Sequence, residues 1–66
     1  MAFQIVLDNP HSTVRKRIVD VVGRDRVAVD GDHLVVSLPD QPAVVGVINA
    51  VNDLGCDIEA VRRLAP

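Results

Sequence analysis

The sequence predicts an α+β domain built from two successive β-α-β units, with a four-stranded antiparallel sheet and two helices on one face of it. Apolar residues alternate with other residues in four short segments, and they recur at helical spacing in two longer segments. A glycine follows each helical segment, as expected at a helix end. At 66 residues the chain has room for one domain, predicted to span residues 1–66.

The first predicted strand covers residues 3–8. Phe3, Ile5 and Leu7 occupy alternate positions and are expected to face the core, because successive side chains of a strand point to opposite faces. The strand is expected to end at Asp8, where the chain turns polar.

A helix is predicted to follow over residues 10–22. Asp8 or Asn9 is its candidate N-cap, because their side-chain oxygens can accept hydrogen bonds from the free N–H groups of a helix start. Pro10 suits the first turn, where no donor is needed, and Gly23 is expected to end the helix in the left-handed conformation. The side chains expected to form its buried face are Val14, Ile18, Val21 and Val22.

The segments 27–29 and 34–38 flank a polar, glycine-containing turn and form a predicted β-hairpin. With Gly31 and Asp32 at the tip, Val29 is paired with an apolar residue of the second strand. An alternative tip, shifted by one residue, would place Asp32 opposite Val29. The first register is preferred because it keeps the apolar side chains on one face.

A second helix is predicted to begin at a cap formed by Asp40 or Gln41, with Pro42 in its first turn, and to end at Gly55. Its expected buried face consists of Val44, Val47, Ile48, Val51 and Leu54. In the last predicted strand, inward positions alternate with outward ones. The inward residues are expected to be Cys56, Ile58 and Ala60, and the outward ones Asp57, Glu59 and Val61.

Two β-α-β units with right-handed crossovers interleave most simply with the first and third strands in the centre of the sheet, which is the ferredoxin-like sandwich. One face of the sheet is then left uncovered. Its middle is predicted to be an apolar patch of Val6, Ala28, Val35 and Val61. Such a patch favours a homodimer or another protein partner, whereas the simpler interpretation is scattered surface valine.

From Phe3 to about Val61, the element order, lengths and glycine positions resemble a heavy-metal-associated domain, the small copper-chaperone module. In that family two cysteines occupy the turn after the first strand, and alignment on Ile18 places His11 and Val14 at those positions. Thiolates select and hold Cu(I). The resemblance therefore implies a binding module without its thiolate pair, acting by protein contacts or weak metal binding. Its cofactor candidate is a transition metal ion with His11 as a ligand, and the alternative is that His11 is an exposed turn residue.

The segments 38–48 and 55–59 resemble the ligand-binding corner of ACT domains, which are regulatory modules for amino acids. The same half of the chain also resembles the small C-terminal domain of some bacterial ABC transporter ATPases. The ACT resemblance implies an alternative function, a homo-oligomeric regulatory domain that binds a small metabolite near the start of the second helix. The implied ligand-binding residues are Asp40, Gln41, Ala43 and Val44.

Catalysis is not expected, because the sequence offers no nucleophile-base pair, no carboxylate pair and no phosphate-cradling glycine loop. Cys56 is the only cysteine, and an inward cysteine usually acts as a small apolar residue. His33 is expected to form a local charge-assisted pair with Asp30 across the hairpin turn.

Binding to nucleic acids or membranes is not expected. The net charge of −2 gives no long-range attraction to either, and Phe3 is the single aromatic side chain available for base stacking. No apolar stretch reaches the roughly 18 residues needed to cross a bilayer. The short opening apolar run without a basic leader and the lone thiol of Cys56 predict a cytoplasmic location.

Overall fold

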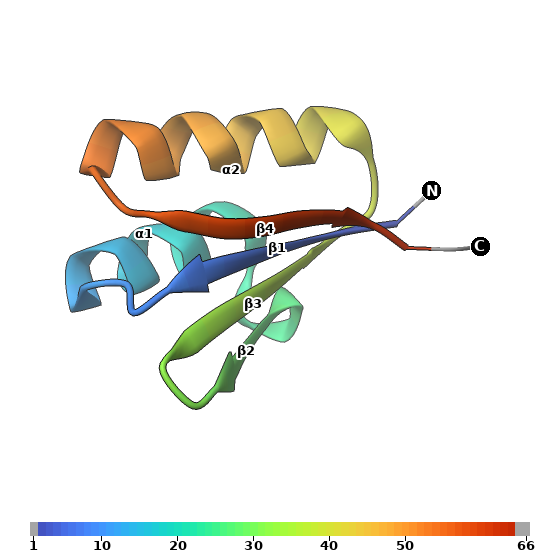
Figure 1. Ribbon diagram of the computed structural model, residues 1–66. Helices are drawn as coiled ribbons and strands as arrows, with labels where there is room; N and C mark the ends of the chain where they lie inside the picture. Colours follow the sequence, from blue (N-terminus) through green and yellow to red (C-terminus); the bar gives the residue numbers. More distant parts are fainter. Residues whose placement is uncertain (1, 65–66) are drawn as a thin grey trace.

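The computed structural model describes residues 2–64 as a four-stranded antiparallel sheet and two α-helices, which confirms the predicted α+β class (Figure 1). The elements in chain order are β1 (Phe3–Asp8), α1 (Ser12–Val22), the 3₁₀ helix η1 (Arg24–Arg26), β2 (Val27–Asp30), β3 (His33–Leu38), α2 (Gln41–Leu54) and β4 (Ile58–Arg63). Only η1 is absent from the sequence prediction. Neither described α-helix combines the length and the apolar character that crossing a membrane requires.

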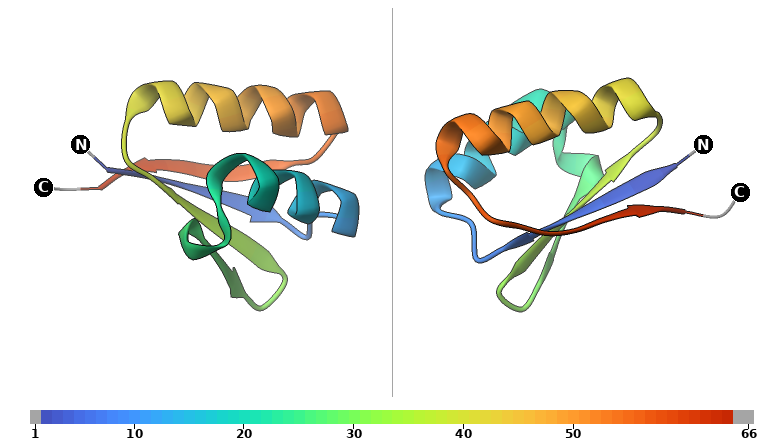
Figure 2. Two further views of the ribbon diagram at one scale, coloured as in Figure 1. Left: turned by 180° about the vertical axis from the view of Figure 1, so that it is seen from behind. Right: turned by 45° about the horizontal axis from the view of Figure 1, so that its top comes forward.

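The strands lie in the order β2-β3-β1-β4, so β1 and β3 are central and β2 and β4 form the two edges. Both α-helices lie on the same side of the sheet, as the two views in Figure 2 show. The hairpin has the preferred register: Val29 is opposite Leu34 and Asp30 is opposite His33. Gly31 and Asp32 therefore form the tip, and Gly31 has a positive φ of 60°.

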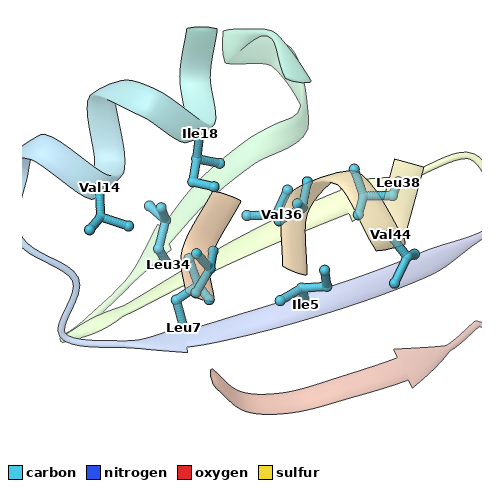
Figure 3. Close-up of a cluster of buried hydrophobic side chains, with 10 residues drawn as sticks. Ile5, Leu7, Val14, Ile18, Leu34, Val36, Leu38 and Val44 are labelled. Carbon is cyan, nitrogen blue, oxygen red and sulfur yellow. The ribbon is translucent and has the colours of Figure 1, made fainter. Parts of the chain in front are cut away.

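The hydrophobic core fills the space between the helices and the sheet (Figure 3). Its buried residues come from β1, β3, α1 and α2, namely Ile5, Leu7, Val14, Ile18, Leu34, Val36, Leu38, Val44, Val47 and Val51. The alternation predicted for β1 and β3 is thus confirmed. Two residues predicted for the buried faces of the helices are exposed instead, Val21 by 51% and Leu54 by 40%, and Val29, on the helix side of β2, is exposed by 64%. They lie near the end of α1, at the last position of α2 and in the edge strand β2, where the opposite layer no longer covers them.

The start of α1 differs from the prediction. Neither Asp8 nor Asn9 caps it: the N-cap is His11, whose side chain makes no capping hydrogen bond, and Pro10 lies before the helix rather than in its first turn. Asn9 adopts a positive φ of 45°, and its N–H donates to the carbonyl of Asp32 at 2.8 Å. The turn is therefore drawn toward the β2–β3 hairpin, which delays the helix until Ser12.

The start of α2 agrees with the prediction. The carboxylate of Asp40 accepts a hydrogen bond from the N–H of Ala43 at 3.0 Å, and Gly55 ends the helix in the left-handed conformation (φ 73°, ψ 28°). Gly23 also has a positive φ of 91°, but its ψ of 147° lies outside the left-handed helical region. The expectation for Gly23 was wrong in this respect, because the chain there extends toward η1.

Candidate functional site: the open sheet face

The sheet face away from the helices carries one continuous row of apolar side chains. Ala28 is opposite Val35, Val35 is opposite Val6, and Val6 is opposite Ala60. Residues directly opposite in antiparallel strands share a face, so these four side chains form a row across all four strands, called here the apolar row. Val6, Val35 and Ala60 are half-buried and Ala28 is exposed.

Val61 does not belong to this row, although the sequence predicted it there. It pairs with Ile5, which is fully buried on the helix-covered face, whereas Ala60 pairs with Val6 and Ile58 with Leu7. The register shift leaves Glu59 as an extra residue in β4, which is a β-bulge. One extra residue moves every later side chain to the other face, so Ala60 takes the place predicted for Val61.

One flank of the apolar row holds a carboxylate cluster around His33, with Asp8, Asp30 and Glu59. The Nε2 atom of His33 lies 2.6 Å from Oε2 of Glu59 and 3.5 Å from Oδ1 of Asp8. The sequence predicted Asp30 as its partner. Asp30 and Asp8 are both opposite His33 in the sheet, but the close contacts of its ring run to Asp8 of β1 and to Glu59 at the bulge of β4.

The other flank of the row is polar and carries less charge. Gln4 is opposite Ser37 on one side and Arg62 on the other, so these three residues follow the apolar row along the strands. Within the four described strands, Arg62 is the one Arg or Lys side chain on the open face, compared with three carboxylates. The face is therefore acidic at one end and weakly basic at the other.

His11 gains no metal-binding neighbour from the fold. It is exposed at the N-cap of α1, and residues 2–64 contain no group of three or more His, Cys, Asp or Glu side chains that could hold a metal ion. A single imidazole rarely makes a metal site. The geometry thus adds no support to the metal-binding hypothesis drawn from the family resemblance.

Cys56 lies partly buried against the core, on the inward side as predicted. Burial raises the pKa of its thiol, and the negative charges of Asp57 and Asp8 raise it further. The thiol donates a long hydrogen bond of 3.6 Å to the carbonyl oxygen of Asp57. A hydrogen bond from the backbone of Asp57 to the sulfur lowers the pKa and partly opposes the rise. At neutral pH the sulfur is therefore held as a thiol, the form that is weak both as a nucleophile and as a metal ligand.

The four residues predicted for metabolite binding do not meet in one pocket. Asp40 is occupied in capping α2. Ala43 lines a 260 Å³ hollow between the two helices, in which Arg26 is the only charged side chain. Gln41 and Val44 line a different hollow of 490 Å³ between α2 and β4.

Sequence reasoning missed Ala60 as a member of the open face, whereas Glu59 was predicted to point outward and its carboxylate does lie beside His33 there. A β-bulge leaves no pattern in β4 that distinguishes it from regular alternation.

Comparison of the chain with protein families, with curated proteins and with solved structures gave no match in any of the three. The proposed function therefore depends on the features of the protein surface.

Proposed function

We propose that the protein is a small non-catalytic binding module of the ferredoxin-like type, which acts through protein contacts made by the open face of its sheet. The observation that carries this proposal is the apolar row beside the carboxylate cluster, because neither is covered by another part of residues 2–64. The β-α-β-β-α-β element order and the central β1 and β3 support the ferredoxin-like description. The resemblance to a heavy-metal-associated domain without its cysteine pair agrees with a role in protein contacts.

The size of the open face favours a weak, transient complex. Three strands of six residues and one of four, spaced about 4.8 Å apart and about 3.3 Å long per residue, give a face of roughly 350 Å². Stable complexes bury about 800 Å² on each partner, so this face supplies about half of that area.

The charge on the face favours a basic partner. Asp8, Asp30 and Glu59 would meet the same three carboxylates if two open faces approached each other with this flank aligned. A partner that presents cationic side chains next to an apolar strip would match both features.

Photocrosslinking in cells that produce the protein tests this proposal. A benzophenone amino acid at exposed Ala28 is expected to label a partner protein, and Val6→Asp is expected to abolish that adduct. The same probe at Asn52, exposed on α2, is the matched control for non-specific labelling. The captured protein should then bind the purified wild type with an affinity that falls as salt rises. Identical adducts from positions 28 and 52, or adducts that persist in Val6→Asp, would contradict the proposal.

The hollow beside α2 favours a second candidate, the regulatory domain that binds a small metabolite. Its 490 Å³ lie within the range of small-molecule sites, and Gln41 and Val44 line it. Calorimetric titration with free amino acids is expected to give heat that Gln41→Ala removes and Val35→Asp preserves. Titration of the wild type and of His11→Ala with Zn²⁺ and with Cu⁺ tests metal binding in the same way. If none of the titrations gives heat, both the metabolite hypothesis and the metal hypothesis are contradicted.

A further inference from the structure

The outer edge of β4 is unpaired within residues 2–64, because β4 is the last strand in the order β2-β3-β1-β4. The N–H of Leu64 donates to the carbonyl of Ala2 at 2.8 Å, and this bond sets the alternation along the strand pair. The backbone groups of Arg62 and Ala60 accordingly face β1, while the N–H and C=O of Val61 point away from the sheet. An exposed edge of this kind is a template for another strand.

Uncovered apolar side chains lie next to this edge. Five large apolar side chains are exposed among residues 2–64, and two of them, Val45 (51%) and Val61 (48%), line the same hollow. Phe3, Val44 and Ile48 also line it. The edge therefore combines outward backbone groups with an apolar surface on the helix side.

We propose that a second copy of this chain occupies the edge, with the two β4 strands antiparallel about a twofold axis and Val61 opposite Val61. A twofold axis perpendicular to the sheet maps each face onto itself, so some residue must lie opposite its own copy. Val61 can exchange two N–H···O=C bonds with its copy because its backbone groups point outward. The two sheets would join into one continuous sheet of eight strands.

Two other registers are disfavoured. Centring the axis on Ala60 would place Val61 opposite Glu59, the extra residue of the bulge, where the regular ladder of hydrogen bonds is disrupted. Centring it on Arg63 would place two guanidinium groups directly opposite each other, and like charges at that position are destabilising. Val61 is thus the register that satisfies both the hydrogen bonds and the charges.

Charge complementarity supports the second copy as the occupant. With Val61 opposite Val61, Arg62 of each copy lies opposite Ala60 of the other, on the open face. Glu59 is the neighbour of Ala60 at the bulge, and its side chain is 52% exposed on the same face, where its Oε2 also contacts His33 of the same copy at 2.6 Å. Each Arg62 therefore comes next to a carboxylate of the other copy, and symmetry makes this contact twice.

The helix side of the junction completes the match. The two Val61 side chains meet at the axis, and the Val45 and Ile48 side chains of each α2 border the same hollow. The proposed contact is distinct from the open-face contact of the proposed function. Val6→Asp is expected to abolish partner crosslinking while leaving the dimer intact, so the two proposals fail separately.

Disulfide trapping tests the register. In a Cys56→Ser background, Val61→Cys is expected to form a covalent dimer under mild oxidation, because directly hydrogen-bonded pairs place their Cα atoms about 5.5 Å apart, within disulfide range. Val29→Cys in the same background is the matched control, since Val29 is an exposed valine on the other edge. Equal trapping at both positions, or none at position 61, would overturn the proposal.

Sedimentation equilibrium tests the dimer without a crosslink. Val61→Lys is expected to weaken dimerisation by about tenfold or more, and Val29→Lys to leave it unchanged. Arg62→Glu and Glu59→Arg should each weaken it, and the double variant should recover it, which loss of folding would not produce. A wild type that stays monomeric at every concentration, or a charge swap without recovery, would overturn the proposal.

Discussion

The two faces of the sheet are built from the same strands and differ in what their alternate residues meet. In β3, Leu34, Val36 and Leu38 are at most 2% exposed beneath the helices, whereas Val35 between them is half-buried on the open face. The covered face is apolar along the whole length of β1 and β3, while the open face is apolar only in one row between charged and polar flanks. Both faces of β1 and β3 carry apolar side chains. The core face differs from the open face in that its apolar stretch runs along the whole strand.

The largest difference is expected between two neighbouring valines of β3. Val36→Ala should lower the free energy of unfolding by about 2 to 3 kcal/mol, because Val36 is fully buried. Val35→Ala should lower it by less than about 1 kcal/mol. Both substitutions remove the same two methyl groups from the same strand, so their difference isolates burial. Urea denaturation measures both, and equal losses would contradict the assignment of the two faces.

A smaller difference is expected between the starts of the two helices that cover the core face. Asp40→Ala should destabilise the protein by about 1 kcal/mol, because it removes the oxygen that accepts from the N–H of Ala43. His11→Ala, at the N-cap of α1, should cost only a few tenths of a kcal/mol, because its side chain makes no capping bond. Thermal unfolding at one pH compares the two variants. A larger loss at His11 would reveal a contribution of its side chain beyond capping.

Local signals in the sequence were sufficient for the elements, the hairpin register and the second helix start. Alternation in β1 and β3 depends on neighbouring residues only, as do the Asp40 cap and the glycine after α2. The turn at Asn9 could not be predicted because its backbone bonds to Asp32, far along the chain. Long-range pairing therefore limits what a local pattern can determine.

Sequence reasoning likewise predicted part of the open face and missed the rest. Val6, Ala28 and Val35 lie on the open face as the alternation requires, and Val61 does not because of the bulge at Glu59. The partners of His33 were missed because they lie on strands far along the chain: Asp8 is opposite it in β1, and Oε2 of Glu59 in β4 lies 2.6 Å from its Nε2. The order of the elements could be predicted from the sequence. The residues that form the open face could be identified only from the register of β4.

The smallest effect concerns Cys56, whose thiol lies where the covered side of the sheet meets solvent. Its pKa is raised by burial first and by Asp57 and Asp8 next, so its reaction with iodoacetamide at neutral pH should be slower than that of the unfolded chain. Asp57→Asn removes one negative charge, lowers the thiol pKa and should accelerate alkylation modestly, whereas Asp53→Asn on α2 should not.

The same raised pKa has a consequence for stability. The unfolded thiol ionises at lower pH than the folded one, so the contribution of Cys56 to stability is complete below the unfolded pKa and is lost as pH rises through the folded value. The free energy of unfolding of Cys56→Ser should therefore fall less steeply with rising alkaline pH than that of the wild type. An alkylation rate in the folded protein equal to that in urea would mean that neither the burial nor the carboxylates restrain the thiolate.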